Sequence, residues 1–206
     1  MEITVFTNLA MKKNLQKVHY EVEGNKSIEY SGEVCFPING VLAKKLTKAD
    51  NVKVVIFAKE DKDGNTEENE RIFKDELNTL NQTIGANIEY KVIRTPFVET
   101  PDMHYDMILK GIDELSQNAT IYADVTYGPK TLPFIIFYVL KFAEKYYNAN
   151  IENIVYGKID FRNDNKIEDF KIFDITPLFY LNGLMDSFEN IQSDKARELL
   201  EKFFKI

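Results

Sequence analysis

The chain has 206 residues, of which 44% are hydrophobic and 29% are charged, a composition typical of a soluble globular protein. Its formal net charge of −7 argues against broad binding of double-stranded nucleic acid, which requires a basic face. The single cysteine, Cys35, excludes an internal disulfide, and the two histidines, His19 and His104, form no zinc-binding pattern. We therefore expect neither a metal nor another cofactor.

The apolar runs of the sequence are too short to span a membrane. The longest, residues 132–140, is followed at once by Lys141. The first residues, Met-Glu-Ile-Thr-Val, lack the basic and apolar regions of a signal peptide. We therefore expect a cytoplasmic protein without a membrane partner.

Strands and helices are expected to alternate along the N-terminal half. Apolar runs such as "NVKVVIFA" indicate buried strands, and the alternation on both sides of "EGNKS" is typical of a β-hairpin. The expected elements are a strand at 3–7, a hairpin at 16–33, a helix at 36–46, a strand at 51–58, a solvated loop at 59–70, a helix at 70–85 and a strand at 87–95. Gly85 is expected to end the second helix. The acidic residues of 59–70 are interpreted as a solvated run rather than a metal site.

The same alternation continues in the C-terminal half. Thr100 is expected to cap a helix in which Pro101 takes the first position. The expected elements are a helix at 100–115, a strand at 119–126, a helix at 133–147, a strand at 150–157, a hairpin at 158–175 turning on "RNDNK", and helices at 177–188 and 193–204.

Strands that alternate with helices predict a mainly parallel, Rossmann-like α/β sheet with helices on both faces and β-hairpin additions. We expect residues 1–175 to form this ligand-binding domain. Residues 176–206 are expected to form a C-terminal helical segment that packs on it or follows it. Ligands of such sheets bind beyond the carboxyl ends of the strands, so the loops at 7–14, 59–65 and 126–133 are candidate sites.

The loop "TYGPKTLP" at residues 126–133 has features of an anion site. Pro133 is tolerated only in the first turn of a helix, so we expect the helix to begin near Leu132 or Pro133 with Thr131 as its cap. Residues 127–130 then lie outside the helix, and Gly128 permits a close approach of backbone to ligand. Lys130 would stand beside the helix N-terminus, where the dipole and loop amides favour a phosphate.

A purely structural role for these loops is the competing interpretation. In it, Asp124 and Thr126 bond to loop amides and Lys130 is solvated. The loop at 7–14 is open to the same choice. Thr7 and Asn8 offer polar groups and Lys12 and Lys13 offer charge, but Thr7 would also simply end the strand and the lysines would be surface residues.

The order of these pieces resembles that of the CARF domains (CRISPR-associated Rossmann fold), in particular the TM1812 family of CRISPR-associated proteins. The resemblance spans nearly the whole chain, from "VFTNLAMKKN" (residues 5–14) onward. Its most specific parts are "DVTYGPKTLP" (124–133), similar to that family's Asp-x-Thr-x-Gly-x-basic-x-x-Pro loop, and "DITP" (174–177). The first loop departs from the family, because it has Leu9-Ala10-Met11 where members often carry glycines.

The resemblance implies binding of a cyclic oligoadenylate, the second messenger of type III CRISPR defence, across the two-fold interface of a homodimer. Lys130 and the amides of 128–131 would hold phosphates, whereas Thr7 and Asn8 would contact ribose or base. Lys12 or Lys13 would neutralise charge. The implied ligand-binding residues are Thr7, Asn8, Lys12, Lys13, Asp124, Thr126, Tyr127, Gly128, Pro129, Lys130 and Thr131.

The resemblance leaves the activity open. Some CARF proteins are ring nucleases that cleave the messenger without a metal, and in that case Lys130 and Thr7 are the expected catalytic residues. Neither histidine has the upstream arginine of a HEPN nuclease motif, so any effector domain is expected to lie outside this chain. The alternative is a Rossmann-like enzyme acting on a nucleotide or a small phosphorylated metabolite, although the glycine fingerprint and the P-loop are missing.

Overall fold

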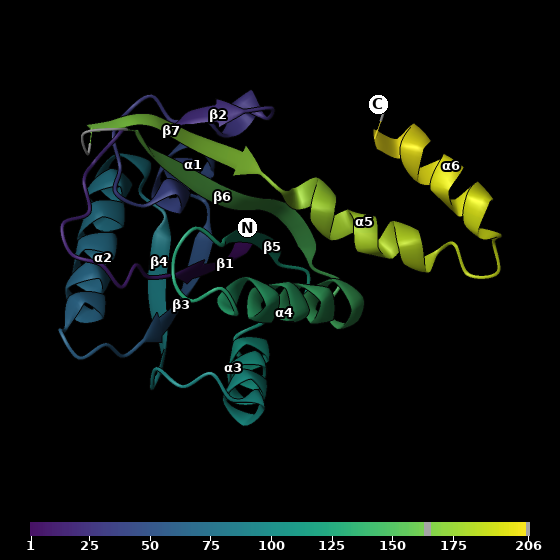
Figure 1. Ribbon diagram of the computed structural model, residues 1–206. Coiled ribbons are helices and arrows are strands. Elements are labelled where there is room, and N and C mark those ends of the chain that lie inside the picture. Colours follow the sequence, from purple (N-terminus) through teal and green to yellow (C-terminus); the bar gives the residue numbers. More distant parts are fainter. Residues whose placement is uncertain (163–165, 205–206) are drawn as a thin grey trace.

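The computed structural model describes residues 1–162 and 166–204, and in this part of the chain seven strands form one sheet (Figure 1). The strand order is β2-β7-β6-β5-β1-β3-β4, and neighbouring strands are parallel except for the antiparallel pair β6–β7. The strands are β1 (Glu2–Asn8), β2 (Glu21–Glu23), β3 (Asn51–Lys59), β4 (Asn87–Thr95), β5 (Thr120–Asp124), β6 (Asn150–Arg162) and β7 (Lys166–Asp174).

Helices cover both faces of this sheet. Successive residues of a strand point to opposite faces, so Val5 of β1 packs with α1 and α2 whereas Phe6 packs with α3 and α4. The helices are α1 (Pro37–Lys45), α2 (Asn65–Ile84), α3 (Pro101–Asp113), α4 (Leu132–Tyr146), α5 (Thr176–Asp186) and α6 (Ser193–Phe204). The predicted fold class, a mainly parallel Rossmann-like α/β sheet, is thereby confirmed.

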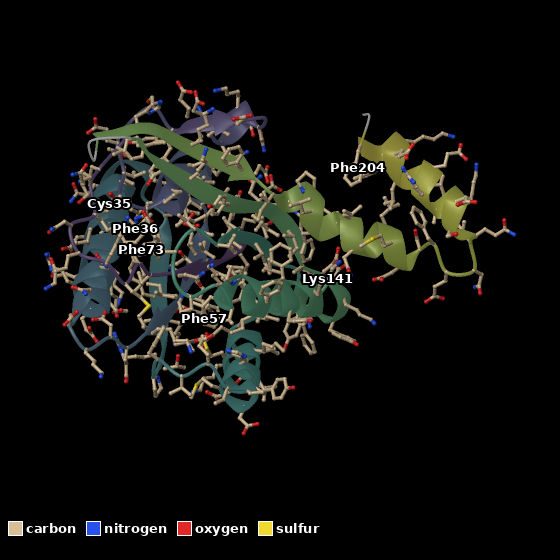
Figure 2. The ribbon with its side chains drawn as sticks, in the orientation of Figure 1. Cys35, Phe36, Phe57, Phe73, Lys141 and Phe204 are labelled. Atoms are coloured by element: carbon tan, nitrogen blue, oxygen red, sulfur yellow. The ribbon has the colours of Figure 1, made fainter. Side chains whose placement is uncertain are left out.

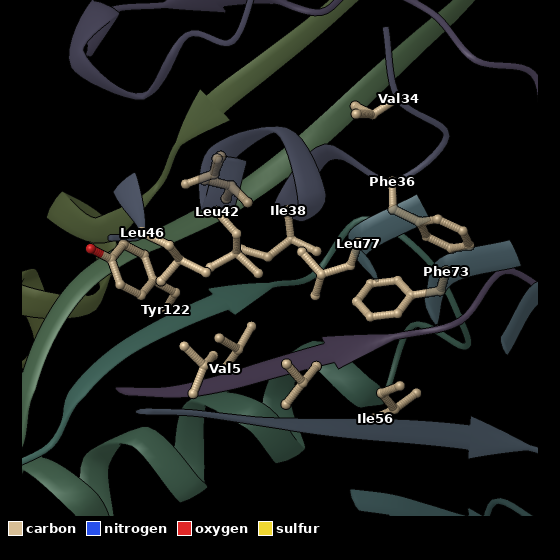
Figure 3. Close-up of a cluster of buried hydrophobic side chains, with 14 of the residues drawn as sticks. Val5, Val34, Phe36, Ile38, Leu42, Leu46, Ile56, Phe73, Leu77 and Tyr122 are labelled. Atoms are coloured by element: carbon tan, nitrogen blue, oxygen red, sulfur yellow. The ribbon is translucent and has the colours of Figure 1, made fainter. Parts of the chain in front are cut away.

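The core on the α1/α2 face joins side chains from the two helices to the central strands. Figure 3 shows this cluster, in which Leu42 of α1 and Phe73 and Leu77 of α2 lie over Val5 and Ile56. All five side chains are fully buried. Each large apolar side chain that is fully buried stabilises the fold by about 1.5–3 kcal/mol. This layer therefore fixes the positions of the central strands.

The sheet has one point at which its winding reverses. From β1 the chain builds outward through β3 and β4 on one side, and then returns through β5 and β6 on the other. The loops that leave the carboxyl ends of β1 and β5 therefore diverge, which is where open α/β sheets bind ligands.

The hairpin expected at 16–33 is wrong. β2 pairs in parallel with β7, and residues after Gly24 form a short 3-10 helix, Lys26–Ile28, instead of a returning strand. Ile28 is fully buried, and the side chain of Asn25 accepts a hydrogen bond from the amide of Ser27. The alternation of the sequence favours a returning strand, but the chain adopts the conformation that buries Ile28 against the α1/α2 core. The expected hairpin at 158–175 is present as β6–β7, although its turn at 163–165 lies outside the described residues.

The solvated loop expected at 59–70 is too long, because α2 already begins at Asn65. The carboxylate of Asp61 accepts hydrogen bonds from the amides of Asn65 and Thr66 at 3.1 and 2.7 Å. It thus satisfies two amides of the first turn from four and five residues earlier in the sequence. Glu67 in the same turn complements the helix dipole. Gly85 ends the helix in a left-handed conformation, as expected.

The C-terminal helices differ in how they meet the rest of the chain. α5 packs on the sheet: Phe179 is buried at 1% exposure, and the hydroxyl of Tyr180 donates to Ile151 O at 3.0 Å. α6 has no buried residue, and Figure 1 shows it beyond α5 and away from the sheet. None of the described helices is long and apolar enough to cross a membrane.

Candidate ligand-binding site

A cleft of about 430 Å³ lies at the carboxyl ends of β1 and β5, at the point where the winding reverses. It is bordered by the loop after β1, the loop after β5 and one residue of the loop after β4. Its lining residues are Ala10, Met11, Lys12, Phe97, Thr126, Tyr127, Gly128 and Pro129. Five of the eleven predicted ligand-binding residues therefore line one cleft, namely Lys12, Thr126, Tyr127, Gly128 and Pro129.

Two predicted residues of β1 lie beneath the cleft rather than in its wall. Thr7 and Asn8 are buried, and the hydroxyl of Thr7 donates to Asn8 O at 3.5 Å. The side-chain amide of Asn8 donates to Tyr127 O at 3.1 Å, so it ties the β1 and β5 loops together. Its Oδ1 atom is buried and has no partner among the described residues.

The loop after β1 is held in place by α2. The side-chain amide of Asn69 donates to Ala10 O at 2.7 Å and to Lys12 O at 3.0 Å, and Asn65 donates to Met11 O at 3.3 Å. Three successive carbonyls are thus occupied by side chains of one helix. These three hydrogen bonds fix the loop to the start of α2.

The loop after β5 begins at a buried carboxylate. Asp124 accepts a hydrogen bond from the amide of Thr126 at 2.8 Å, while its other oxygen, Oδ2, has no partner among the described residues. Burial raises the pKa of Asp124 to about 6, against the hydrogen bonds that act to lower it. The hydroxyl of Thr126 accepts from Gly157 N at 2.7 Å, which ties the loop to β6. Asp124 therefore makes the contact to a loop amide that the competing interpretation expects, whereas the hydroxyl of Thr126 bonds to an amide of β6 instead.

Tyr127 turns its ring into the core. Its hydroxyl donates to Cys35 O at 3.0 Å, and its ring meets Phe36 edge-on at 5.6 Å. Burial raises the pKa of the Tyr127 hydroxyl far above its ordinary value, so this group stays a neutral hydrogen-bond donor. Tyr127 therefore contributes structure to the floor of the cleft more than an exposed aromatic face.

Gly128 is the residue at which the loop backbone lies close to the side chains of Leu132 and Asn8. Its φ of +83° is left-handed, and a Cβ placed there would lie 2.7 Å from Leu132 Cδ1 and 3.5 Å from Asn8 Cβ. A side chain is therefore excluded both by backbone strain and by contact. The next turn is closed by Leu132 N, which donates to Pro129 O at 3.0 Å, and α4 begins at Leu132 as the two prolines predict.

Backbone amides at the start of α4 are available to a ligand. Within the described residues, the N–H groups of Gly128, Lys130 and Thr131 donate to no other protein group. They lie at the positive end of the α4 dipole, beside the cleft. The Lys130 side chain is exposed next to them. A helix N-terminus with unused amides and a neighbouring ammonium is suited to one anionic group.

Thr131 occupies the N-cap position of α4, but the prediction that its side chain caps the helix is wrong. Thr131 has helical dihedral angles, and its hydroxyl donates to the carboxylate of Glu99 instead. Glu99 also receives Lys59 Nζ at 3.2 Å and His104 Nε2 at 3.1 Å. Partial burial acts to raise the pKa of Glu99, but these three hydrogen bonds outweigh it and the pKa lies below its ordinary value.

The predicted lysines are divided between two places. Lys12 lines the cleft and Lys130 lies beside it, whereas Lys13 lines a separate pocket with Asp63 and Glu68 near the start of α2. Lys13 is thus not brought together with the others.

Sequence reasoning missed Lys59, Phe97 and Glu99. The side chain of Lys59 is fully buried, and Phe97 forms part of the cleft wall. A lysine directly after the apolar run of residues 54–58 was the available signal for Lys59, because an ammonium at such a position needs a partner when it is buried.

The fold and the cleft define a Rossmann-like α/β protein with a cleft at its switch point. No family model matches the sequence. The chain is similar to the CRISPR-associated protein MJ1674 of Methanocaldococcus jannaschii, with 21% identity over 115 residues. The match covers 50% of this chain and 18% of that protein, so the chain corresponds to only a small part of its relative's length.

Proposed function

We propose that this chain has a CRISPR-related role as a CARF-type sensor that binds a cyclic oligoadenylate, cyclic tetra- or hexaadenylate, in type III antiviral defence. The observation that carries the proposal is the set of unused amides at Gly128, Lys130 and Thr131 beside a cleft at the switch point. The similarity to a CRISPR-associated protein supports the biological setting.

The site suits a ligand that presents phosphate and sugar or base in sequence. A phosphate at the start of α4 would be held by the loop amides and by the Lys130 ammonium, with Lys12 on the facing loop. Asn8 does not line the cleft, so its part in binding would be to tie the β1 and β5 loops together through its hydrogen bond to Tyr127 O.

A homodimer is part of this proposal. A cleft of about 430 Å³ is of the size that takes a small-molecule ligand, which is less than a ring of four or six nucleotides requires. Two clefts related by a two-fold axis would hold such a ring between them, and an isologous interface is the commonest oligomeric arrangement.

The proposal is tested by titrating the protein with cyclic tetraadenylate and cyclic hexaadenylate in a calorimeter, with Lys130→Ala beside the wild type. We expect the substitution to weaken binding by about 1.5–3 kcal/mol, the range for a lost charge-assisted hydrogen bond. The fold should survive, because Lys130 is exposed. Absence of binding to either ring by the wild type contradicts the proposal, and equal affinity of the variant contradicts the assignment of Lys130.

Cleavage of the messenger is the further step of this proposal. Lys130 is the better placed of the two predicted catalytic residues, because the Thr7 hydroxyl is buried and donates to Asn8 O. Linear products formed from either ring in EDTA would identify a metal-independent ring nuclease, and their loss in Lys130→Ala would assign the stabilising charge.

The alternative is an enzyme acting on a nucleotide or a small phosphorylated metabolite. The volume of a single cleft favours it, since one mononucleotide fits that space without a second chain. The same calorimeter separates the two functions: tighter binding of AMP than of either ring, by a monomeric protein, supports the alternative.

A further inference from the structure

Phe97 occupies an unusual position at the edge of the cleft. It follows β4 at the tip of a three-residue turn, in which Val98 N donates to Pro96 O at 2.8 Å. Its side chain is 57% exposed and lines the same cleft as Gly128 and Pro129. Ligand pockets are lined mainly by hydrophobic and aromatic side chains, so an exposed ring at this cleft is placed to contact a ligand.

The turn that carries Phe97 is held by a buried charge. The side chain of Lys59 is fully buried at the end of β3, and its ammonium donates to Val98 O at 3.1 Å and to Pro96 O at 3.5 Å. These carbonyls flank Phe97 on both sides. The same ammonium pairs with Glu99 at 3.2 Å, and Glu99 receives the hydroxyl of Thr131.

This bracing has a consequence for binding. The backbone on each side of Phe97 is fixed to β3, and through Glu99 it is tied to the start of α4, where the unused amides lie. An exposed ring on a fixed backbone loses little conformational freedom when it contacts a ligand, so such a contact retains most of its free energy.

Phe97 is also the cleft aromatic with a ring free to stack. The other aromatic residue of the lining, Tyr127, packs edge-on against Phe36 and donates its hydroxyl to Cys35 O. An anion site and an exposed aromatic ring at one cleft match a ligand that joins a phosphate to a planar base. Bases stack on aromatic side chains in single-stranded nucleic-acid sites.

We infer that Phe97 is a specificity-determining residue whose ring stacks on an adenine base of the bound nucleotide, while the α4 N-terminus holds the adjoining phosphate. The inference rests on the proposed function, because it takes the ligand to be an adenine nucleotide.

The test uses cyclic tetraadenylate and cyclic hexaadenylate in which one adenine is replaced by the fluorescent base 2-aminopurine, whose emission is quenched by stacking. Wild type should quench the probe, and Phe97→Tyr should bind and quench as the wild type does. Phe97→Ala should bind about five- to 150-fold more weakly, the loss expected for one base–aromatic stack, and quench less at saturation. Lys130→Ala should weaken binding but leave the quenching at saturation unchanged.

The outcomes separate the inference from the proposed function. If the wild type binds neither ring, both fail. If the wild type binds and Phe97→Ala binds and quenches equally, the stacking role fails while the proposed function stands. If light scattering shows that Phe97→Ala loses a dimer while a saturating probe is quenched as before, Phe97 is an interface residue and the stacking role is overturned. Circular dichroism should show an unchanged fold for both Phe97 variants, because the ring is exposed.

Discussion

Gly128 shows how one residue shapes the cleft. Its left-handed φ and the 2.7 Å approach of Leu132 to a Cβ placed there act together. We expect Gly128→Ala to lower the free energy of unfolding by more than the 1–2 kcal/mol, roughly, that a left-handed conformation costs a non-glycine residue. Chemical denaturation measures this loss.

Gly24 supplies the matched control for Gly128. It has a similar φ of +87° but no atom within 4 Å of a Cβ placed there. Gly24→Ala should therefore show the backbone cost alone. A loss in Gly128→Ala no larger than in Gly24→Ala would mean that Leu132 moves aside without cost.

The buried carboxylate of Asp124 makes stability depend on pH. Its pKa is about 6 in the folded chain against an ordinary value of 3.8, so the folded state holds this proton more tightly than the unfolded state. The protonated Asp124 carboxyl therefore stabilises the folded state by about 3 kcal/mol relative to the ionised one. This stabilisation is fully present below pH 4 and is lost as pH rises through 6. Asp124→Asn removes it. The free energy of unfolding of the variant should therefore rise relative to wild type between pH 4.5 and pH 7.5, and a constant difference would contradict the assignment.

At the scale of elements, α2 caps α1 through Glu76. α1 begins at Pro37, and its N-cap residue Phe36 makes no side-chain cap. The buried carboxylate of Glu76 instead accepts from the amides of Cys35 and Phe36, at 2.7 and 3.3 Å, and from Asn39 Nδ2 at 2.9 Å. Figure 2 shows Cys35 and Phe36 beside Phe73, which lies in α2 as Glu76 does.

Removal of the Glu76 carboxylate should therefore be costly. Glu76→Ala leaves buried donors without an acceptor, and we expect the free energy of unfolding to fall by about 2–4 kcal/mol. The control is Glu68→Ala on the exposed face of α2, which breaks a surface pair with Arg71, removes one acidic residue of the first turn and should cost about 1 kcal/mol or less. Equal losses in thermal or chemical unfolding would show that the cap carries no special weight.

Helices and strands could be predicted where the local pattern of apolar residues determines them. The prediction failed where a contact with a distant part of the chain determines the structure. The apolar run of β3 and the prolines of α4 fixed those elements locally, and Pro133 alone placed residues 127–130 outside the helix. The 16–33 segment failed because β2 pairs with β7, which lies about 150 residues later and leaves no mark on the local alternation.

The candidate site divides in the same way. Gly128 and Lys130 were found from their own loop, because turn and helix-start chemistry is local. Lys59, Phe97 and Glu99 were missed, since their roles arise only when the end of β3 meets the loop after β4. The side-chain cap expected from Thr131 is missing for a related reason. The hydroxyl of Thr131 donates to the carboxylate of Glu99, 32 residues away in sequence, and not to the backbone of α4.

For the whole molecule, the two C-terminal helices make different contributions. Phe179 of α5 packs edge-on against Phe137 of α4 and is buried, whereas α6 buries no residue, and Figure 2 shows Phe204 far from the sheet. Stability that comes from buried apolar surface should therefore extend through α5 and stop before α6.

Two shortened chains test this division. A chain ending at residue 192 should unfold within about 0.5 kcal/mol of the full chain and bind cyclic oligoadenylate equally, because no side chain of α6 is buried. A chain ending at residue 175 should lose at least about 3 kcal/mol, since it uncovers the cluster around Phe137 and removes the Tyr180 hydrogen bond to Ile151 O. Marked destabilisation of the chain ending at residue 192 would mean that α6 is covered in solution. The covering partner would then be a second copy of the chain, which light scattering would detect.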